Sequence, residues 1–204
     1  MAIEGLYQCF KHWGDKGGVW CISDTHFNEN DLKQAFPHRP NDEILLKQIN
    51  QKVGKAGVLL HLGDVGDLEY AKRLKGYKIL IMGNHDQSAT KFKGIFDEIY
   101  EGPLQIAPHL ILSHEPLNCS WAYNMHGHNH SGAFCEYGKM NLCCDVIGYS
   151  PINFNAFIKS GKLKECVDIH RETIDKQTAN KKKRGQRRYA GIYEDYSDID
   201  IIKR

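Results

Sequence analysis

The stretch His126-Gly127-His128-Asn129-His130 decides how the fold is read, because three histidines alternate here with small residues. At least two of the three imidazoles can therefore point into one space. Neutral imidazole is a common ligand for transition metals. The HxH pattern alone is weak evidence, since it also occurs in polar loops, and its weight comes from the chain that precedes it.

Four earlier apolar runs also end in side chains that can bind a metal through oxygen or nitrogen. They end in Asp24-Thr25-His26, Gly63-Asp64, Gly83-Asn84-His85-Asp86 and Ser113-His114-Glu115-Pro116. Each cluster alone could be a turn, a helix cap or a solvated loop. Five such coincidences are a poorer explanation than one site, at which Asp, Asn and His converge from the ends of neighbouring strands.

Length and composition set the outer limits of function. The 204 residues suit one domain with a sizeable core, and a formal net charge of +2 creates no field that would steer the whole protein to nucleic acid or anionic lipid. No apolar run is long enough to span a bilayer, and residues 1–10 lack the pattern of a signal peptide. Seven scattered cysteines without a CxxC pair favour a reduced compartment. We therefore expect a cytoplasmic protein without a membrane partner.

Apolar runs alternate with helical patterns along the chain. Strands are expected at 6–12, 19–23, 58–62, 78–82, 110–113, 123–125, 140–147 and 163–169. Helices are expected at 43–53, 68–74 and 152–159, whereas 27–40 is expected to be a loop. This alternation predicts an α/β fold with much parallel pairing, in which ligands collect beyond the carboxyl ends of the strands.

The composition changes after His170. Basic residues at 181–188 are followed by acidic residues at 194–200. We expect residues 1–170 to form the main domain and residues 171–204 to form a charged C-terminal tail, which could dock on that domain. A basic run is most often a solvated segment, so nucleic acid is an alternative partner and not the favoured one. The sequence does not indicate an oligomeric state.

The ligand types favour two divalent ions. Two neighbouring cations need an anionic ligand between them, and Asp64 is the candidate for that bridge, with Asp24 as a second negative charge. A neutral amide oxygen comes from Asn84, and nitrogen ligands come from His26, His114, His128 and His130. This mixture of oxygen and nitrogen favours manganese, our first expectation, and also iron, zinc or nickel, over calcium.

In their order and spacing, the motifs from Asp24 to His130 resemble those of the calcineurin-like metallophosphoesterases, and the flanks resemble the small single-domain bacterial and phage members. The resemblance implies a sandwich of two mixed β-sheets flanked by helices. It also implies two metal sites that share Asp64. One ion would be held by Asp24, His26, Asp64 and His130, and the other by Asp64, Asn84, His114 and His128.

The resemblance further implies that His85 is a catalytic residue and not a metal ligand. Its imidazole would lie over the substrate phosphate, where it can protonate the leaving oxygen or stabilise phosphoryl charge, and Asp86 is suited to orient it. The nucleophile would be a hydroxide that bridges the two metals and attacks in line. The chain departs from the serine/threonine phosphatase branch, because Asp86 replaces the usual glutamate and residues 64–68 lack Asp-Arg-Gly.

The leading hypothesis is therefore a dinuclear metal-dependent phosphoesterase whose partner is a small phosphoester. A phosphodiester is slightly favoured, because no basic cluster near the motifs would receive a dianionic monoester. The alternatives are a phosphomonoesterase for a small phosphorylated metabolite and a nucleic-acid-processing enzyme that uses the basic tail. A non-catalytic metal-binding module is least favoured, since all ligands and His85 are present. Outside the motifs, Arg39 could be solvated or touch a phosphate, and Asp67 is expected to cap a helix.

Overall fold

The computed structural model describes residues 5–136, 138–161 and 176. The chain divides into two units, residues 1–166 and 167–204, and the fold below is that of the first unit. The expected strand at 163–169 lies outside the described residues, as does the expected tail 171–204 apart from Lys176. Among the residues described, no helix has the length and apolar character needed to cross a membrane.

The first sheet has five strands in the order β10-β1-β2-β3-β4. Its strands are β1 (Val19–Ile22), β2 (Val58–His61), β3 (Tyr77–Ile81), β4 (Glu98–Tyr100) and β10 (Ile152–Asn153). The four strands from β1 to β4 are parallel, whereas β10 pairs with β1 in the antiparallel sense. Parallel pairing brings the carboxyl ends of β1, β2 and β3 to the same edge.

The second sheet has the order β5-β6-β7-β9-β8. Its strands are β5 (Leu104–Ala107), β6 (Leu110–Leu112), β7 (Tyr123–His126), β8 (Cys135–Glu136) and β9 (Lys139–Asn141). The central strands β6, β7 and β9 are parallel, and the two edge strands are antiparallel. An isolated bridge between Ser23 and Cys143 joins the ends of the two sheets. The carboxyl ends of strands from both sheets therefore meet at one place.

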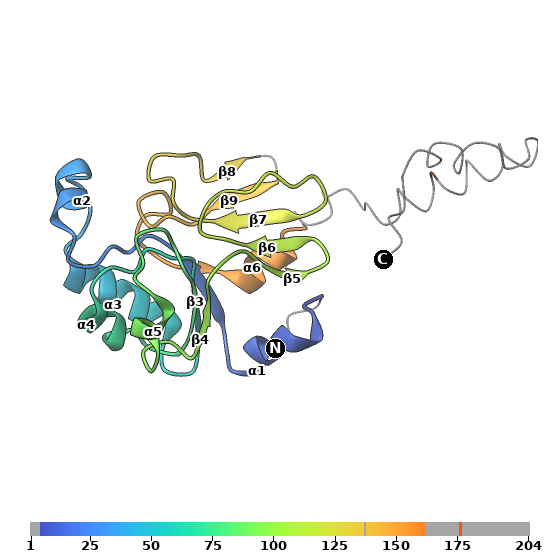
Figure 1. The fold of residues 1–204 in the computed structure, drawn as a ribbon, viewed down its shortest axis with the longest axis horizontal. Helices are drawn as coiled ribbons and strands as arrows, with labels where there is room; N and C mark the ends of the chain where they lie inside the picture. The colour runs from blue at the N-terminus through green and yellow to red at the C-terminus, as the bar shows by residue number, and fades with distance from the viewer. Residues whose placement is uncertain (1–4, 137, 162–175, 177–204) are drawn as a thin grey trace, which may run out of the picture. The chain divides into compact units, whose positions relative to one another are not determined.

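Alternate residues of a strand point to opposite faces of its sheet, so each sheet turns one face toward the other. The core lies between these two inner faces. From the first sheet Cys21, Leu60 and Ile79 are fully buried in the same cluster as Leu112 and Met125 of the second. This packing confirms the predicted α/β fold, with two mixed sheets and helices outside them (Figure 1).

Helices cover the other face of the first sheet (Figure 1). These are α3 (Asp42–Val53), α4 (Leu68–Arg73) and α5 (Ala89–Phe92). Leu45 and Ile49 of α3, one helical turn apart, pack against Leu59 of β2. Asn41 caps α3 by accepting a hydrogen bond from the Ile44 amide. Asp67 caps α4 by accepting from the amides of Glu69 and Tyr70, as the sequence predicted.

Three segments differ from the sequence-based prediction. Residues 6–12 do not form a strand but a 3-10 turn, η1 (Gln8–Phe10), followed by α1 (His12–Asp15). A helical conformation is favoured here because it lets Phe10 and Trp13, three residues apart, pack together. Their tilted rings have centroids 4.9 Å apart, and both residues are buried. The expected loop 27–40 contains α2 (Asn30–Ala35).

The expected strand at 140–147 is the third difference, since β9 ends at Asn141 and the chain then turns. The amide of Cys143 is bound by the Asn141 side chain at 3.0 Å, which satisfies it outside the sheet. Helix α6 (Phe154–Lys159) follows β10, and the side chain of Asn153 caps it by accepting from the Ala156 amide. The turn after β9 brings Asp145 next to the predicted ligands, which a continued strand would not do.

Candidate metal centre

All seven predicted ligands lie at the edge where the two sheets meet. Each one is placed just beyond the carboxyl end of a parallel strand. Asp24 and His26 follow β1, Asp64 follows β2, Asn84 follows β3, His114 follows β6, and His128 and His130 follow β7. Backbone hydrogen bonds connect these segments, including those from the Asp24 amide to the Gly63 carbonyl and from the Gly127 amide to the His114 carbonyl. The predicted convergence of strand ends is therefore present.

One group of potential ligands surrounds Asp24. The Nε2 atom of His26 lies 3.9 Å from Oδ1 of Asp24 and 3.4 Å from Oδ2 of Asp64. The Nε2 atom of His130 lies 3.7 Å from the same Oδ1 of Asp24. The side chains of Asp24, His26 and Asp64 are buried, and their ligand atoms lie close enough together to hold one metal ion.

A second group surrounds His114. Its Nε2 atom lies 2.8 Å from Oδ1 of Asn84 and 3.2 Å from Oδ2 of Asp64. The Nδ1 atom of His128 lies 3.1 Å from the same Asn84 oxygen and 3.2 Å from Nε2 of His114. The other nitrogen of His114 is 2.8 Å from the Leu62 carbonyl, which orients the ring so that Nε2 faces the cluster.

Asp64 connects the two groups. Its Oδ2 atom lies within 3.4 Å of His26 and 3.2 Å of His114, and its Oδ1 atom accepts a hydrogen bond from the His85 amide at 2.9 Å. This is the position expected of a carboxylate shared by two metal ions. The shared role itself stays a prediction.

The backbone at this edge is held in conformations that L-residues rarely adopt. Four predicted ligands have positive φ angles, namely Asp24 at 60°, His26 at 39°, Asp64 at 56° and His128 at 68°. Left-handed backbone at a residue other than glycine costs about 1–3 kcal/mol each and persists where the surroundings impose it, often at functional sites. The strain is thus concentrated on the residues that the sequence predicted as ligands.

Two motif glycines leave room for the carboxylates. A Cβ atom on Gly83 would lie 2.2 Å from Oδ1 of Asp64, and one on Gly127 would lie 2.4 Å from Oδ2 of Asp24 and 2.0 Å from Oγ of Ser23. No side chain fits at these distances. The Gly-Asn and Gly-His pairs of the motifs are therefore steric requirements for placing Asp64 and Asp24.

The model of the family described as calcineurin-like phosphoesterase matches residues 18–153, which include all the ligand clusters. The chain belongs to the calcineurin-like phosphoesterase family. Its fold of two mixed sheets with flanking helices is that of the family, as the sequence predicted. Membership supports a hydrolase and implies divalent metal ions.

This chain is similar to the solved structure of a protein of unknown function from Aquifex aeolicus, which is 26% identical with a TM-score of 0.60. The match covers 70% of this chain and 98% of that one. The nuclease MPE of Pseudomonas putida is 22% identical with a TM-score of 0.42, over 55% of this chain and 61% of that one. A Streptococcus pneumoniae protein described as a predicted phosphoesterase is 17% identical with a TM-score of 0.33, over 62% and 70% of the two chains. No curated protein matches the sequence significantly.

The surroundings of one buried atom, Nε2 of His26, indicate whether the residues present suit a metal ion. Nδ1 of His26 lies 2.7 Å from Oε2 of Glu29, whereas Nε2 has no hydrogen-bond partner among the described residues. Burial also lowers the pKa of His26, although Glu29 and Asp64 oppose the change. A neutral ring that donates its Nδ1 hydrogen to Glu29 directs the lone pair of Nε2 between two buried carboxylates. A cation at this point would satisfy all three groups, so the residues fit the metal that the family implies.

The electrostatics of the cluster favour positive charge. Burial by itself lowers the pKa of His114, but its hydrogen bond to Asp64 and the charge of Asp24 raise the value to about 9. In His130 burial is likewise outweighed, chiefly by the hydrogen bond to Asp145, and the pKa rises to about 10. Without metal these imidazoles carry protons, and divalent ions would compete with those protons for the same nitrogens.

His85 lies next to the cluster with an exposed side chain. Its ring meets the His26 ring edge-on, with centroids 5.4 Å apart, and it borders a cavity of about 440 Å³. The hydrogen bonds of the Asp86 carboxylate to described residues go to backbone amides and not to this imidazole. Its Oδ2 accepts from the amides of Asp64 and Gly83 and its Oδ1 from the amide of Val65, at 2.8–2.9 Å. Asp86 thus ties two ligand loops together, and a catalytic role for it stays a prediction.

The expectation for Arg39 was wrong in both its forms. The side chain is neither solvated nor able to touch a phosphate, because it is only 1% exposed. Nη1 donates to Oδ2 of Asp145 at 2.7 Å, and Nη2 donates to the carbonyls of Asp24 and Thr25. Sequence reasoning also missed Asp145 itself. The signal was there, since Asp145 follows the run ending in Cys144, but the expected strand at 140–147 concealed it.

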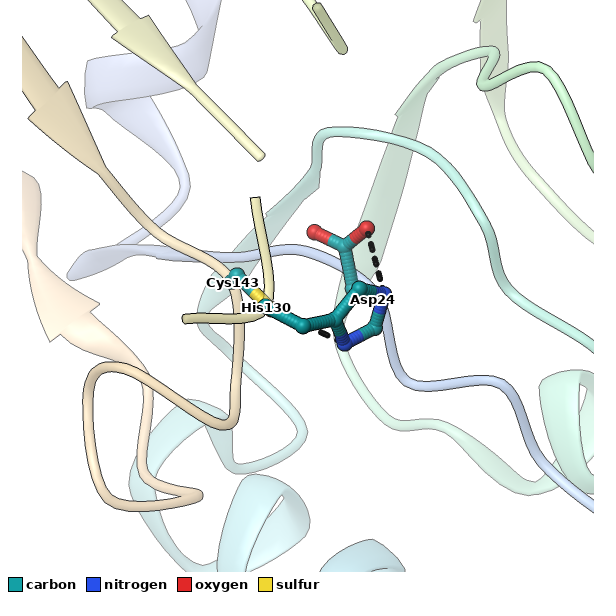
Figure 2. Close-up of side chains that lie close together, drawn as sticks. All are labelled: Asp24, His130 and Cys143. Atoms are coloured by element: carbon teal, nitrogen blue, oxygen red, sulfur yellow. Dashed lines mark hydrogen bonds and ion pairs between the residues drawn. The ribbon is translucent and has the colours of Figure 1, made fainter. Parts of the chain in front are cut away.

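A third group that could hold a metal consists of Asp24, His130 and Cys143 (Figure 2). The His130 ring lies between the other two, with Nε2 toward Asp24 at 3.7 Å and Nδ1 toward the Cys143 sulfur at 3.5 Å. A hydrogen bond with Cys144, together with burial, raises the pKa of the Cys143 thiol. The thiol therefore lies protonated against the nitrogen that faces away from Asp24.

Proposed function

We propose that this chain is a dinuclear metal-dependent phosphodiesterase for small substrates. The observation that carries the proposal is the position of Asp64, whose Oδ2 lies between Nε2 of His26 and Nε2 of His114. Each of these nitrogens belongs to a separate group of potential ligands. Two divalent ions, when bound, would supply the Lewis acidity that activates water and neutralises phosphate charge. Manganese is the first expectation, with iron, zinc or nickel as alternatives.

His85 is the proton donor in this proposal. Its backbone amide is bound to Asp64, which fixes the residue beside the ligands, while the imidazole is exposed toward solvent. A substrate phosphate beside the cluster would therefore meet the ring, and the ring can give its proton to the departing ester oxygen. Such a group must lie within hydrogen-bond reach of the oxygen that leaves, and the exposed ring is free to reach it.

Two cavities beside the ligands support a diester. One has about 440 Å³ and is bordered by His85, and the other has about 270 Å³ and is bordered by Asn84 and His114. A diester has two substituents to place around its phosphate, whereas a monoester has one. Neither lining includes a lysine or arginine among the described residues, so the charge-assisted contacts that usually hold a phosphate dianion are not provided.

The same linings favour small, uncharged substituents over nucleic acid. Glu29 and Asp67 border the larger cavity, and Glu101 and Glu115 border the smaller one. A polyanion that crossed the site would pass these carboxylates and gain no counter-charge from either wall. The seven scattered cysteines, without a CxxC pair in the sequence, support a cytoplasmic location for the enzyme.

The test is metal analysis of the purified protein, followed by activity assays with added Mn²⁺. We expect two ions per chain and a kcat/KM for bis-p-nitrophenyl phosphate above that for p-nitrophenyl phosphate. Cyclic phosphodiesters and a single-stranded oligonucleotide complete the panel. Preference for the monoester, or a single ion per chain with full activity, would overturn the proposal. Faster cleavage of the oligonucleotide with a steep salt dependence would favour the nucleic-acid alternative.

A further inference from the structure

Arg39 and Asp145 form a buried ion pair beside the candidate metal centre. Their side chains are each 1% exposed, and Nη1 lies 2.7 Å from Oδ2. Burying two charges costs free energy that the attraction between them repays only in part, so such a pair is a weak device for stability alone. The contacts that each partner makes to the predicted ligands point to a different use.

Asp145 makes its second contact with His130. The same Oδ2 atom lies 2.7 Å from Nδ1 of His130. The opposite ring nitrogen, Nε2, faces Asp24 at 3.7 Å, as Figure 2 shows. When Nδ1 carries the hydrogen and donates it to the carboxylate, Nε2 is left with the lone pair that a metal requires.

Arg39 makes its second contact with the other ligand-bearing loop. Its Nη2 atom donates to the backbone carbonyls of Asp24 and Thr25. One guanidinium therefore connects the loop after β1 with the carboxylate that holds a histidine from the loop after β7. Neither contact is with solvent or with a cavity, and both fix the position of residues that face the cluster.

We propose that Asp145, supported by Arg39, is a positioning residue that holds His130 with Nδ1 protonated and Nε2 directed at the metal site beside Asp24. This inference rests on the proposed function, because it takes His130 as a metal ligand. A metal-bound histidine that donates its second N–H to a carboxylate is fixed in tautomer and orientation and becomes a stronger ligand. Losing such a partner typically lowers metal affinity about 10–100-fold.

Two comparisons within the chain sharpen the inference. The Cys143 sulfur is also near Nδ1 of His130, but at 3.5 Å it is a weaker acceptor than a carboxylate at 2.7 Å. Glu29 plays the corresponding part for His26, at 2.7 Å from its Nδ1. The Glu29 side chain is 37% exposed, however, so solvent can replace it, whereas solvent cannot reach Asp145.

The first measurement is Mn²⁺ binding by calorimetry to wild type and Asp145→Asn, which keeps the shape and removes the charge. We expect one of the two sites to weaken about 10–100-fold while the other is unchanged. Glu98→Gln is the matched control, because Glu98 also holds a histidine, His12, at 2.6 Å but lies outside the cluster. It should leave both affinities unchanged.

The second measurement needs no substitution and therefore does not depend on the folding of a variant. In Zn²⁺-loaded wild type with ¹⁵N-labelled histidine, two-bond ¹H–¹⁵N spectra should show His130 protonated at Nδ1 and metal-bound at Nε2. A His130 that binds through Nδ1 would overturn the inference. Equal affinities of wild type and Asp145→Asn for two ions would overturn it too while the proposed function stands. A wild type that binds no metal would overturn the function and the inference together.

Discussion

The Nε2 atom of His26 lies 3.4 Å from Oδ2 of Asp64 and has no hydrogen-bond partner among the described residues. Both side chains are at most 2% exposed. When the neutral ring donates its Nδ1 hydrogen to Glu29, the lone pair of Nε2 points toward the carboxylate. A lone pair and an anion that face each other away from water repel, and a cation between them would replace the repulsion with coordination.

Removing metal is therefore expected to lower the thermal stability of the protein. An ion that binds only the folded chain stabilises it by about 2.7 kcal/mol when present at 100 times its Kd. The measurement is Tm by calorimetry across a Mn²⁺ titration, with a chelator at one end. Ca²⁺, which prefers sites built from oxygen ligands, should raise Tm less. A Tm that does not change with Mn²⁺ would contradict the argument that the unpartnered Nε2 of His26 marks a metal site.

The variant Asp64→Asn is expected to weaken both metal sites, because one carboxylate oxygen faces His26 and His114. The loss should exceed the roughly 10–100-fold that removal of an outer partner costs. Metal content after dialysis, measured by mass spectrometry, reports it directly. Asp97→Asn is the control, since Asp97 accepts from the Lys78 amide on the surface and should keep two ions. Normal binding of two ions by Asp64→Asn would show that this residue is not the bridge.

Gly83→Ala is expected to disrupt metal binding through sterics alone. The new Cβ would lie 2.2 Å from Oδ1 of Asp64 and 2.7 Å from its amide nitrogen, so the carboxylate must move. Gly102→Ala is the control, because no heavy atom lies within 4 Å of its Cβ position and its φ is not positive. Metal content and circular dichroism of both variants separate loss of the site from loss of the fold. If Gly83→Ala folds and holds two ions, the motif glycine is not needed for placing Asp64.

The pH dependence of stability should include a contribution from His61, which is fully buried on β2. Burial lowers its pKa from 6.5 to about 3. Below pH 6.5 the His61 imidazole therefore binds a proton in the unfolded chain, whereas in the folded chain it does so only near pH 3. The free energy of unfolding should fall as pH drops from there toward 3, by up to about 1.4 kcal/mol per pH unit.

Urea titrations of the metal-free protein between about pH 4 and pH 7 test this prediction. His61→Gln is the comparison, because glutamine does not titrate and can still bond to Thr25, whose Oγ1 lies 2.9 Å from Nε2 of the histidine. The variant should lose part of the slope whatever its absolute stability. Identical slopes for the two proteins would place the acid sensitivity elsewhere.

The part of the site that the sequence predicted is the part that follows strands. Asp24, Asp64 and Asn84 each come directly after a buried run, and parallel pairing necessarily brings such positions to one edge. His114 and His128 follow the same rule in the second sheet. The local pattern and the tertiary arrangement therefore carry the same information for these residues.

The remainder depends on contacts that local patterns do not contain. Arg39 pairs with a residue 106 positions away, and nothing near it in the sequence distinguishes it from a solvated arginine. The strand expected at 6–12 became helical because Phe10 and Trp13 pack into the core, and Trp13 also donates to Glu98 at 2.9 Å. The ligand edge was predictable from spacing, whereas the groups that support it were not.

His85→Ala separates catalysis from metal binding. Asn84 and His85 are adjacent, yet Asn84 faces His114 at 2.8 Å while the His85 ring meets His26 edge-on and borders the larger cavity. Removing a positioned general acid should lower kcat by roughly 10²–10⁴-fold for a poor leaving group. The loss should be much smaller for a nitrophenolate, which departs without a proton.

The measurement is kcat for wild type and His85→Ala against an alkyl diester and a nitrophenyl diester, with metal content taken on the same samples. Metal content should be unchanged, because no predicted coordination bond is removed. Equal losses for both leaving groups would mean that His85 binds the phosphate or stabilises its charge and does not protonate the leaving oxygen. Loss of an ion would make His85 a ligand. An unchanged kcat for the alkyl diester would leave the reaction without its acid, and the chain would then be better explained as a metal-binding module.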